Sequence, residues 1–277
     1  MSAPAPLAAV IGNPIGHSKS PRLHGHWLKS LGIDGHYIAL HVEENTLEAT
    51  LKLLPSLGFK GINVTIPHKE RVLELATDIT PTAARIGAAN TLTFNKAGGF
   101  QADNTDAYGF LENLRTEAAD WDASAGPAAV LGAGGACRAV LDALLEAGCP
   151  EIRLANRTLA RAERLAFQFG PRVKVVPWGE NEAIFSEAAL AVNTTSLGMS
   201  GGDGFEFDLR ALGETAVATD LIYTPLETPF LKAAKQRGCT TVDGLGMLLH
   251  QAAPGFERWF GTRPSVTEDL RNLVLAP

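Results

Sequence analysis

A glycine-rich turn between an apolar strand and an apolar helix constrains the fold of this chain more than any other feature. The turn follows a buried strand expected at residues 128–131, and a helical stripe with Val140 and Leu144 comes after it. Glycines let the backbone approach a ligand closely, and the unpaired N–H groups at a helix start bind anions. The pattern predicts the pyrophosphate-binding loop of a dinucleotide fold. The residues that we expect to line this loop are Gly132, Ala133, Gly134, Gly135 and Ala136.

The end of the next strand predicts which dinucleotide binds. NAD enzymes usually carry Asp or Glu there, to hold the ribose 2′-hydroxyl. This sequence has Asn156, Arg157 and Thr158, with Arg161 one helical turn later, so no carboxylate would repel a 2′-phosphate. Each arginine could donate a charge-assisted hydrogen bond of about 1.5–3 kcal/mol. We therefore expect NADP, the alternative being two solvated arginines at a helix start.

The whole chain alternates short apolar runs with helical patterns, which predicts an α/β fold in two parts. The first part has a βαβ rhythm, and parallel strands need long, usually helical connections, so we expect parallel strands in an open sheet with helices on both faces. Its strands are expected at 7–12, 37–42, 61–65 and 89–94. In the second part, a Rossmann-type doubly wound sheet, strands are expected at 128–131 and near 151–155, 173–176, 189–193, 216–220 and 240–243. The corresponding domains are a substrate-binding domain at 1–105, an NADP-binding domain at 106–244, and C-terminal helices at 245–277 that return to the first domain.

Polar residues cluster in the first part where its expected strands end. They are Ser18 and Ser20, then Asn63, Thr65 and Lys69, and finally Asn90, Asn104, Thr105 and Asp106. In open α/β sheets ligands bind beyond the carboxyl ends of the strands, so three clusters can form one site. Such a site suits a small ligand with several hydroxyls and a carboxylate. Each residue also has a structural interpretation: Ser20 could be the N-cap of a helix with Pro21 at its first position, Asp106 could cap the following helix, and Lys69 could be solvent-exposed.

Carbonyl reduction needs a proton donor for the alkoxide, and Lys69 partnered by Asp106 is the candidate pair. Burial lowers a lysine pKa and a neighbouring carboxylate raises it, so the sequence does not fix the net shift. His17 and His68 are alternatives, although a lone histidine is more often structural. No His and Cys residues share a zinc-ligand spacing, so no metal site is expected.

Charge and composition limit the partners. A net charge of −6 offers no broad positive field for nucleic acid or an anionic membrane, which favours a small-molecule ligand. The three scattered cysteines, an odd number, argue against a secreted disulfide framework. No uncharged apolar run is long enough to span a membrane. We expect a soluble, cytoplasmic monomer or homodimer.

Taken together in order, the motifs resemble those of the shikimate dehydrogenase family along nearly the whole chain. The matching segments are Gly12 to Pro21, Asn63 to Lys69, Ala89 to Thr91, Asp103 to Asp106, Gly132 to Ala136, Asn156 to Thr158, Asn193 to Met199, Asp220 to Pro225 and Gly244 to Gln251. The resemblance implies NADPH-dependent, reversible reduction of 3-dehydroshikimate to shikimate in aromatic amino-acid biosynthesis.

The resemblance also implies a role for individual residues. Lys69 and Asp106 match the catalytic pair of the family. Ser18, Ser20, Asn63, Thr65, Asn90, Tyr223 and Gln251 match residues that hold the substrate. Leu221, Gly244 and Met247 match residues near the nicotinamide, beside the NADP-binding residues already named.

Three alternatives stay open. Quinate/shikimate dehydrogenases use NAD more readily, but the serine pair and Arg157 and Arg161 favour shikimate and NADP. A catalytically silent relative that senses metabolites would not need Lys69 and Asp106. Glutamyl-tRNA reductase shares the dinucleotide loop and the Asn-Arg-Thr segment, but it needs a cysteine nucleophile and binds tRNA, which an acidic chain does not favour.

Overall fold

The computed structural model describes residues 5–199 and 207–276. Two compact units make up the chain: unit 1 comprises residues 1–106 and 249–277, and unit 2 comprises residues 107–248. Both boundaries fall inside helices rather than between elements. The described residues contain no helix long and apolar enough to cross a membrane.

Unit 1 is built on a six-stranded sheet in the order β2-β1-β3-β5-β6-β4. Its strands are β1 (Leu7–Gly12), β2 (His36–His41), β3 (Phe59–Val64), β4 (Asp78–Ile79), β5 (Thr91–Phe94) and β6 (Phe100–Asp103). Its helices are α1 (Ser20–Ser30), α2 (Leu47–Leu53), α3 (Arg71–Leu75), α4 (Pro81–Ile86) and α11 (Glu268–Leu275), with 3-10 turns at Glu44–Thr46 and Leu54–Leu57. The sheet is mixed, because β5 runs antiparallel to both β3 and β6.

The hairpin of β5 and β6 corrects the parallel arrangement expected from the βαβ rhythm. Gly98 and Gly99 lie between the two strands at φ +99° and +75°, and Asn95 N–H donates to the Gly99 carbonyl at 3.0 Å. Glycine adopts such angles without steric cost, so a short connection suffices and no crossover helix is needed. The Gly-Gly pair between two apolar runs was a hairpin signal that the sequence analysis missed, together with β6 and the short β4.

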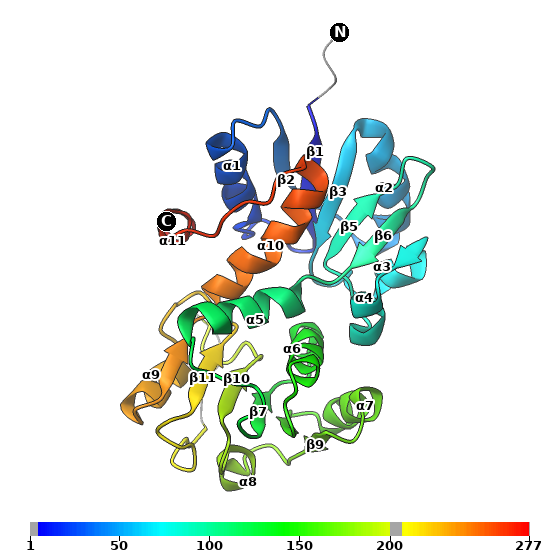
Figure 1. The fold of residues 1–277 in the computed structure, drawn as a ribbon. Helices are drawn as coiled ribbons and strands as arrows, with labels where there is room; N and C mark the ends of the chain where they lie inside the picture. Colours follow the sequence, from blue (N-terminus) through cyan, green and yellow to red (C-terminus); the bar gives the residue numbers. More distant parts are fainter. Residues whose placement is uncertain (1–4, 200–206, 277) are drawn as a thin grey trace. The chain divides into compact units, whose positions relative to one another are not determined.

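Alternate residues of the unit 1 strands face opposite layers. Ala9, Ile11, Ile62 and Val64 belong to a buried cluster that includes Leu47 and Leu51 of α2, Val72 of α3 and Ala83 of α4. On the other face Gly61 allows close approach of Trp259, whose Nε1 donates to the Leu92 carbonyl at 3.0 Å. Trp259 lies on α10 (Leu245–Phe260), which Figure 1 shows in orange along this face beside α1. The period-2 alternation of a strand thus separates a largely apolar layer from one that also carries polar groups.

Unit 2 is a six-stranded parallel sheet in the order β12-β11-β10-β7-β8-β9, the order of the doubly wound dinucleotide fold. Its strands are β7 (Ala128–Leu131), β8 (Ile152–Ala155), β9 (Val173–Val175), β10 (Leu190–Asn193), β11 (Val217–Asp220) and β12 (Thr240–Val242). Its helices are α5 (Asp106–Glu117), α6 (Gly135–Glu146), α7 (Leu159–Phe169), α8 (Asn181–Phe185) and α9 (Pro229–Gln236). Helices α8 and α9 pack on Ala129, Ala191 and Ala218, and α6 lies next to α7 (Figure 1). The predicted Rossmann-type fold is confirmed.

Candidate active site

Lys69 and Asp106 form an ion pair in unit 1. Lys69 follows β3, and Asp106 begins α5, where the helix dipole favours a carboxylate. The Lys69 Nζ atom lies 2.5 Å from Oδ2 of Asp106, and the two side chains are only 19% and 10% exposed. A charge pair that is largely withdrawn from water interacts more strongly than a surface pair. The Lys69 ammonium can donate a proton to an oxygen of a bound ligand, and the partly buried Asp106 carboxylate holds the ammonium in position.

Asn90 orients this pair from the other side. Its Nδ2 donates to Oδ1 of Asp106 at 2.8 Å and to Oε1 of Gln251 at 3.1 Å. Its Oδ1 accepts from the backbone N–H of Thr105 at 2.8 Å and from the hydroxyls of Thr105 and Thr91. A backbone N–H only donates, so the amide orientation of Asn90 is fixed. A ligand hydroxyl would reach the second N–H of Asn90 by sharing it with Gln251 or replacing that bond.

Strand direction explains why residues so far apart in sequence meet. Asn63 lies near the carboxyl end of β3, and it pairs with Thr91, the first residue of antiparallel β5. Thr91 pairs in turn with Asp103, the last residue of β6. The carboxyl ends of β3 and β6 therefore lie at the same sheet edge as the amino end of β5. Asn90 reaches the site from the beginning of a strand, not from the end that the sequence analysis assumed.

Asn63 is buried and held by three hydrogen bonds. Its Nδ2 donates to the Asn90 carbonyl at 3.1 Å and to the Thr91 hydroxyl at 3.2 Å. Its Oδ1 accepts from the hydroxyl of Tyr37 at 2.7 Å. Thr65 follows β3 next to Gly12, where a Cβ on the glycine would lie 2.5 Å from the Thr65 methyl. Tyr37 was not among the residues singled out in the sequence, because it lies inside the strand β2.

Ser18 and Ser20 lie between β1 and α1. The Ser18 Oγ accepts from the backbone N–H of Ser20 at 3.3 Å, which leaves the Ser18 hydroxyl proton to other acceptors. Ser20 is the first residue of α1, whose N-cap is Lys19, and no side chain caps this helix. The capping alternative for Ser20 is therefore wrong.

His68, one alternative to Lys69 as proton donor, is buried and makes a hydrogen bond within the protein. It is 1% exposed and its Nε2 lies 2.7 Å from the Val42 carbonyl. A carbonyl only accepts, so Nε2 carries the proton and donates it to Val42. His68 is a structural residue beside Lys69.

In unit 2, the glycine loop at the start of α6 has the form a pyrophosphate requires. Gly132 has φ +103°, and a Cβ there would lie 2.6 Å from the Thr194 hydroxyl. Gly134 and Gly135 are exposed, and a Cβ on either would meet nothing within 4 Å apart from its own chain neighbours and helix backbone, so the space beside the loop is open to a ligand. Asn156 supports the loop, since its Oδ1 accepts from Ala133 N–H at 3.1 Å. The loop fits the diphosphate of a dinucleotide.

The Asn156 to Arg161 segment joins β8 to α7. The Asn156 Nδ2 donates to the Thr158 carbonyl at 2.9 Å, and Arg161 N–H donates to the same carbonyl at 3.0 Å. Arg157, Thr158 and Arg161 are exposed, and Thr158 is the N-cap of α7 although its hydroxyl caps no backbone N–H. Two guanidinium groups and a hydroxyl at a helix start suit a 2′-phosphate.

The residues matched to the nicotinamide also belong to unit 2. A Cβ on Gly244 would lie 2.4 Å from the Leu221 carbonyl oxygen, so this glycine lets the two loops touch. Met247 is buried, and Tyr223 is half-buried, which raises its pKa. Asp220 holds the adjoining loop, and burial raises its pKa despite bonds from Thr228, Ile222 and Asn193. Asp220 begins the family motif from Asp220 to Pro225, and this motif is the signal by which its role could be found in the sequence.

The thiol of Cys137 is buried and does not support cysteine catalysis. Burial raises the pKa of Cys137, which lies just after the glycine loop, to about 12. Such a thiol is not an activated nucleophile, which argues against the mechanism of glutamyl-tRNA reductase. Within residues 5–199 and 207–276 no group of three or more His, Cys, Asp or Glu side chains could hold a metal ion.

Unit 2 is a doubly wound sheet with a glycine loop suited to a dinucleotide, and unit 1 carries a Lys–Asp pair among hydroxyls and amides. Together these features define a dinucleotide-dependent oxidoreductase of small polar ligands. Family models agree with this class. The shikimate dehydrogenase substrate binding domain matches residues 10–92, shikimate/quinate 5-dehydrogenase matches 116–198, and the shikimate 5'-dehydrogenase C-terminal domain matches 244–274.

Known proteins give the same result over the whole chain. The shikimate dehydrogenase (NADP(+)) of Roseobacter denitrificans is 58% identical over 270 residues, which is 98% of both chains. The shikimate 5-dehydrogenase of Thermus thermophilus, solved with NADP(H) and shikimate, is 40% identical with a TM-score of 0.86 and covers 97% of this chain and 98% of its own. The quinate dehydrogenase of Corynebacterium glutamicum, solved with NAD, is 30% identical with a TM-score of 0.90 and covers 98% and 99%. The chain belongs to the shikimate dehydrogenase family, which confirms the resemblance seen in its sequence.

Proposed function

We propose that this protein catalyses the reversible NADPH-dependent reduction of 3-dehydroshikimate to shikimate, a step of aromatic amino-acid biosynthesis. The observation that carries the proposal is the largely buried ion pair of Lys69 and Asp106, which Asn90 orients. A silent, metabolite-sensing relative would have no need of an aligned proton donor. The relatives at 56–58% identity are named shikimate dehydrogenase (NADP(+)), which supports the same activity.

Each residue has a role that follows from its chemistry. Bound NADPH supplies a hydride to the ring ketone. Lys69 protonates the resulting oxygen, and Asp106 orients the ammonium and accepts a hydrogen bond from a substrate hydroxyl. The serine hydroxyls donate to the substrate carboxylate, and the remaining side chains hold its hydroxyls. The substrate-binding residues in this proposal are Ser18, Ser20, Asn63, Thr65, Asn90, Tyr223 and Gln251.

NADP is the cofactor, held by unit 2. The Gly132 to Ala136 loop and the start of α6 bind the pyrophosphate, and Arg157, Thr158 and Arg161 bind the 2′-phosphate. Leu221, Gly244 and Met247 lie near the nicotinamide in this proposal. We further propose that the enzyme is cytoplasmic. It is a monomer or homodimer in this proposal, and size-exclusion chromatography with light scattering tests the oligomeric state.

Four initial rates test the proposed function. The purified protein is assayed by cofactor absorbance with shikimate and with quinate, each with NADP and with NAD. We expect the highest kcat/KM with shikimate and NADP. The second candidate is a quinate dehydrogenase that uses NAD, favoured by the likeness to the Corynebacterium glutamicum enzyme. A higher kcat/KM with quinate and NAD would replace the proposal with that candidate, and no turnover in all four assays would support a silent relative.

A further inference from the structure

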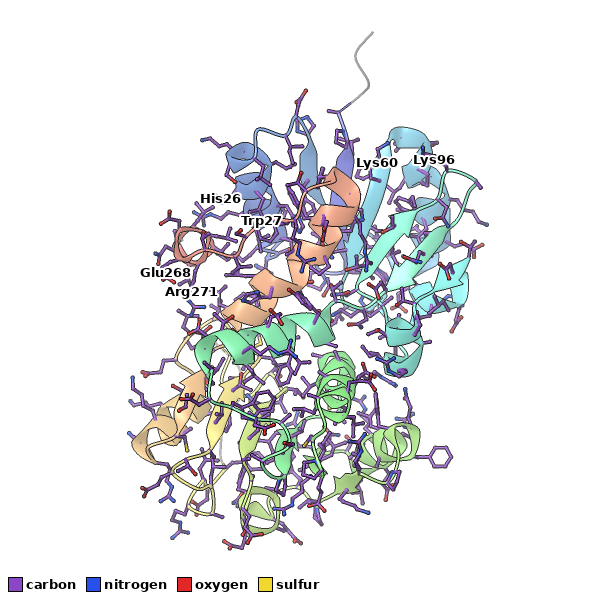
Figure 2. The ribbon with its side chains drawn as sticks, viewed as in Figure 1. His26, Trp27, Lys60, Lys96, Glu268 and Arg271 are labelled. Atoms are coloured by element: carbon purple, nitrogen blue, oxygen red, sulfur yellow. The ribbon has the colours of Figure 1, made fainter. Side chains whose placement is uncertain are left out.

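Tyr37 and His24 form a parallel aromatic stack in unit 1. Their ring centroids lie 3.9 Å apart with an interplanar angle of 1°. The ring of His24 also meets Trp27 edge-on at 5.6 Å and lies 5.8 Å from Phe256 and 6.0 Å from Trp259. Trp27, labelled in Figure 2 on α1, donates its Nε1 to the Ser265 carbonyl at 3.0 Å. His24 is thus enclosed by aromatic rings from α1, β2 and α10.

The His24 ring is neutral and makes no ordinary hydrogen bond. Its exposure is 0%, and neither ring nitrogen has a hydrogen-bond partner among the described residues. Burial lowers its pKa to about 3, and the Asn63 side chain, which lies near the ring without meeting hydrogen-bond geometry, opposes this lowering only in part. A neutral imidazole in this setting acts as a flat packing surface, and the phenol it packs against is Tyr37.

The hydroxyl of Tyr37 has one strong partner, Oδ1 of Asn63 at 2.7 Å. Burial raises the pKa of Tyr37 well above its usual value, although the Ser20 hydroxyl opposes this, so the phenol keeps its proton and donates it. The other end of the Asn63 amide faces the Asn90 carbonyl, which only accepts, so its Nδ2 must lie there. Both N–H groups of Asn63 are used within the protein. Its remaining capacity is one lone pair on Oδ1, which suits a hydroxyl donor and not a carboxylate.

We propose that Tyr37 is a positioning residue of the substrate site: held by its stack on His24, it fixes the Asn63 carboxamide so that the Asn63 oxygen accepts from a substrate hydroxyl. This inference rests on the proposed function, because it concerns the same substrate site. Tyr37 acts through Asn63 and touches neither the cofactor nor the reacting atoms. Its loss should therefore weaken substrate binding and leave the chemical step intact.

The variant Tyr37→Phe keeps the stacked ring and removes only the hydroxyl. We expect KM for shikimate to rise about three- to tenfold, the effect of one net hydrogen bond. kcat should change less than about twofold, and KM for NADP should stay the same, because neither depends on Asn63. Trp27→Phe is the matched control, since it disturbs the same aromatic cluster and removes a hydrogen bond without touching Asn63. An equal rise in KM for Trp27→Phe would mean that Tyr37 only supports packing, and an unchanged KM for Tyr37→Phe would remove the inference altogether.

A double-mutant cycle decides whether Tyr37 acts through Asn63. In the Asn63→Ala background, Tyr37→Phe should change KM for shikimate less than about twofold. The same three- to tenfold rise in both backgrounds would overturn the inference. The unaltered protein is assayed first with shikimate and with quinate, and the cycle uses the substrate that it turns over. Turnover of neither refutes the proposed function and this inference with it, whereas normal turnover with independent effects of the two substitutions refutes the inference alone.

Discussion

The Nζ atom of Lys69 lies 2.5 Å from Oδ2 of Asp106, and Oδ1 of the same carboxylate accepts from Asn90 at 2.8 Å. Both oxygens of Asp106 are therefore engaged on the protein side, and each has a lone pair left for a ligand. The carboxylate thus fixes where the ammonium of Lys69 points before any substrate arrives. Preorganisation of this kind spares the enzyme from reorienting its proton donor during the reaction.

Removal of the ammonium should abolish proton transfer while leaving most of the binding site intact. We expect Lys69→Ala to lower kcat by about 10² to 10⁴ with a much smaller change in KM for shikimate. Lys60→Ala is the control, because Lys60 is an exposed lysine of the same strand region, labelled in Figure 2. Steady-state kinetics of both variants measure the difference. A kcat for Lys69→Ala equal to that of the unaltered protein would exclude Lys69 as the donor.

Loss of the Asn90 side chain should lower activity by more than the effect of a single hydrogen bond, because Asn90 aligns both Asp106 and Gln251. Asn90→Ala leaves these groups without their shared partner, and misplacement of a catalytic group by about 1 Å costs roughly 100-fold in rate. We expect kcat to fall by about that factor and the free energy of unfolding to fall by about 1–3 kcal/mol. Asn95→Ala, in the exposed hairpin of β5 and β6, should change neither quantity appreciably. Kinetics and urea unfolding check both, and a normal kcat for Asn90→Ala would show that Asp106 needs no such support.

The two arginines after β8 should govern the choice of cofactor. Arg157→Ala and Arg161→Ala should each lower kcat/KM with NADPH about 10- to 100-fold and leave kcat/KM with NADH nearly unchanged, because only NADPH carries the 2′-phosphate. Arg115→Ala removes an arginine that is 62% exposed on α5 and serves as the control. Equal use of NADPH before and after both changes would contradict the proposed phosphate site.

Two glycines of the same loop should respond differently to alanine. Gly132 has φ +103° and lacks room for a Cβ, so Gly132→Ala should lower the free energy of unfolding by about 2 kcal/mol or more. Gly134 has φ −92° and open space, so Gly134→Ala should be neutral or stabilising by about 0.4–1 kcal/mol. KM for NADP should nevertheless rise in Gly134→Ala, about tenfold, because the methyl group occupies the space of the pyrophosphate. Unfolding curves and cofactor kinetics separate the two effects, and an unchanged KM for NADP in Gly134→Ala would place the diphosphate elsewhere.

His24 should make the fold sensitive to acid. Its pKa falls from 6.5 to about 3 on burial, so between these values the unfolded chain binds a proton that the folded protein does not. The contribution of neutral His24 to the free energy of unfolding is fully present above about pH 6.5. It decreases as the pH falls, and the free energy of unfolding is about 2 kcal/mol lower at pH 5. The rings around His24 are uncharged, and Tyr37 stays protonated in this range, so no neighbour offsets the effect. Urea unfolding at pH 7.5 and pH 5.0 measures it.

The matched variants for acid stability are His24→Leu and His36→Gln. His24→Leu should lose about 2 kcal/mol less than the unaltered protein when the pH is lowered from 7.5 to 5.0. His36 is exposed on β2, and His36→Gln should retain the response of the unaltered protein. An identical loss in all three proteins would mean that His24 is not held neutral in the fold.

Local pattern alone predicted the parts of this protein whose chemistry is local. The glycine turn before α6 and the Asn156 to Arg161 segment each lie in a few consecutive residues, so spacing and residue type predicted a dinucleotide loop and a 2′-phosphate site. The doubly wound order of unit 2 followed from regular alternation of strand and helix. Lys69 and Asp106 were predicted as a pair through their motifs, and the structure brings them within 2.5 Å.

Tertiary structure alone decided how the remaining side chains act, because hydrogen bonding and stacking depend on which strands are neighbours. The antiparallel course of β5 brings Asn90 to the site from the start of a strand, and it makes Asn90 a shared partner of Asp106 and Gln251, 161 residues away from Asn90. Ser20 lost its capping interpretation only when the start of α1 was known. Tyr37 and His24 looked like ordinary residues of a strand and a helix. Their stack, and the hydrogen bond that fixes Asn63, exist only where α1, β2 and β3 pack together.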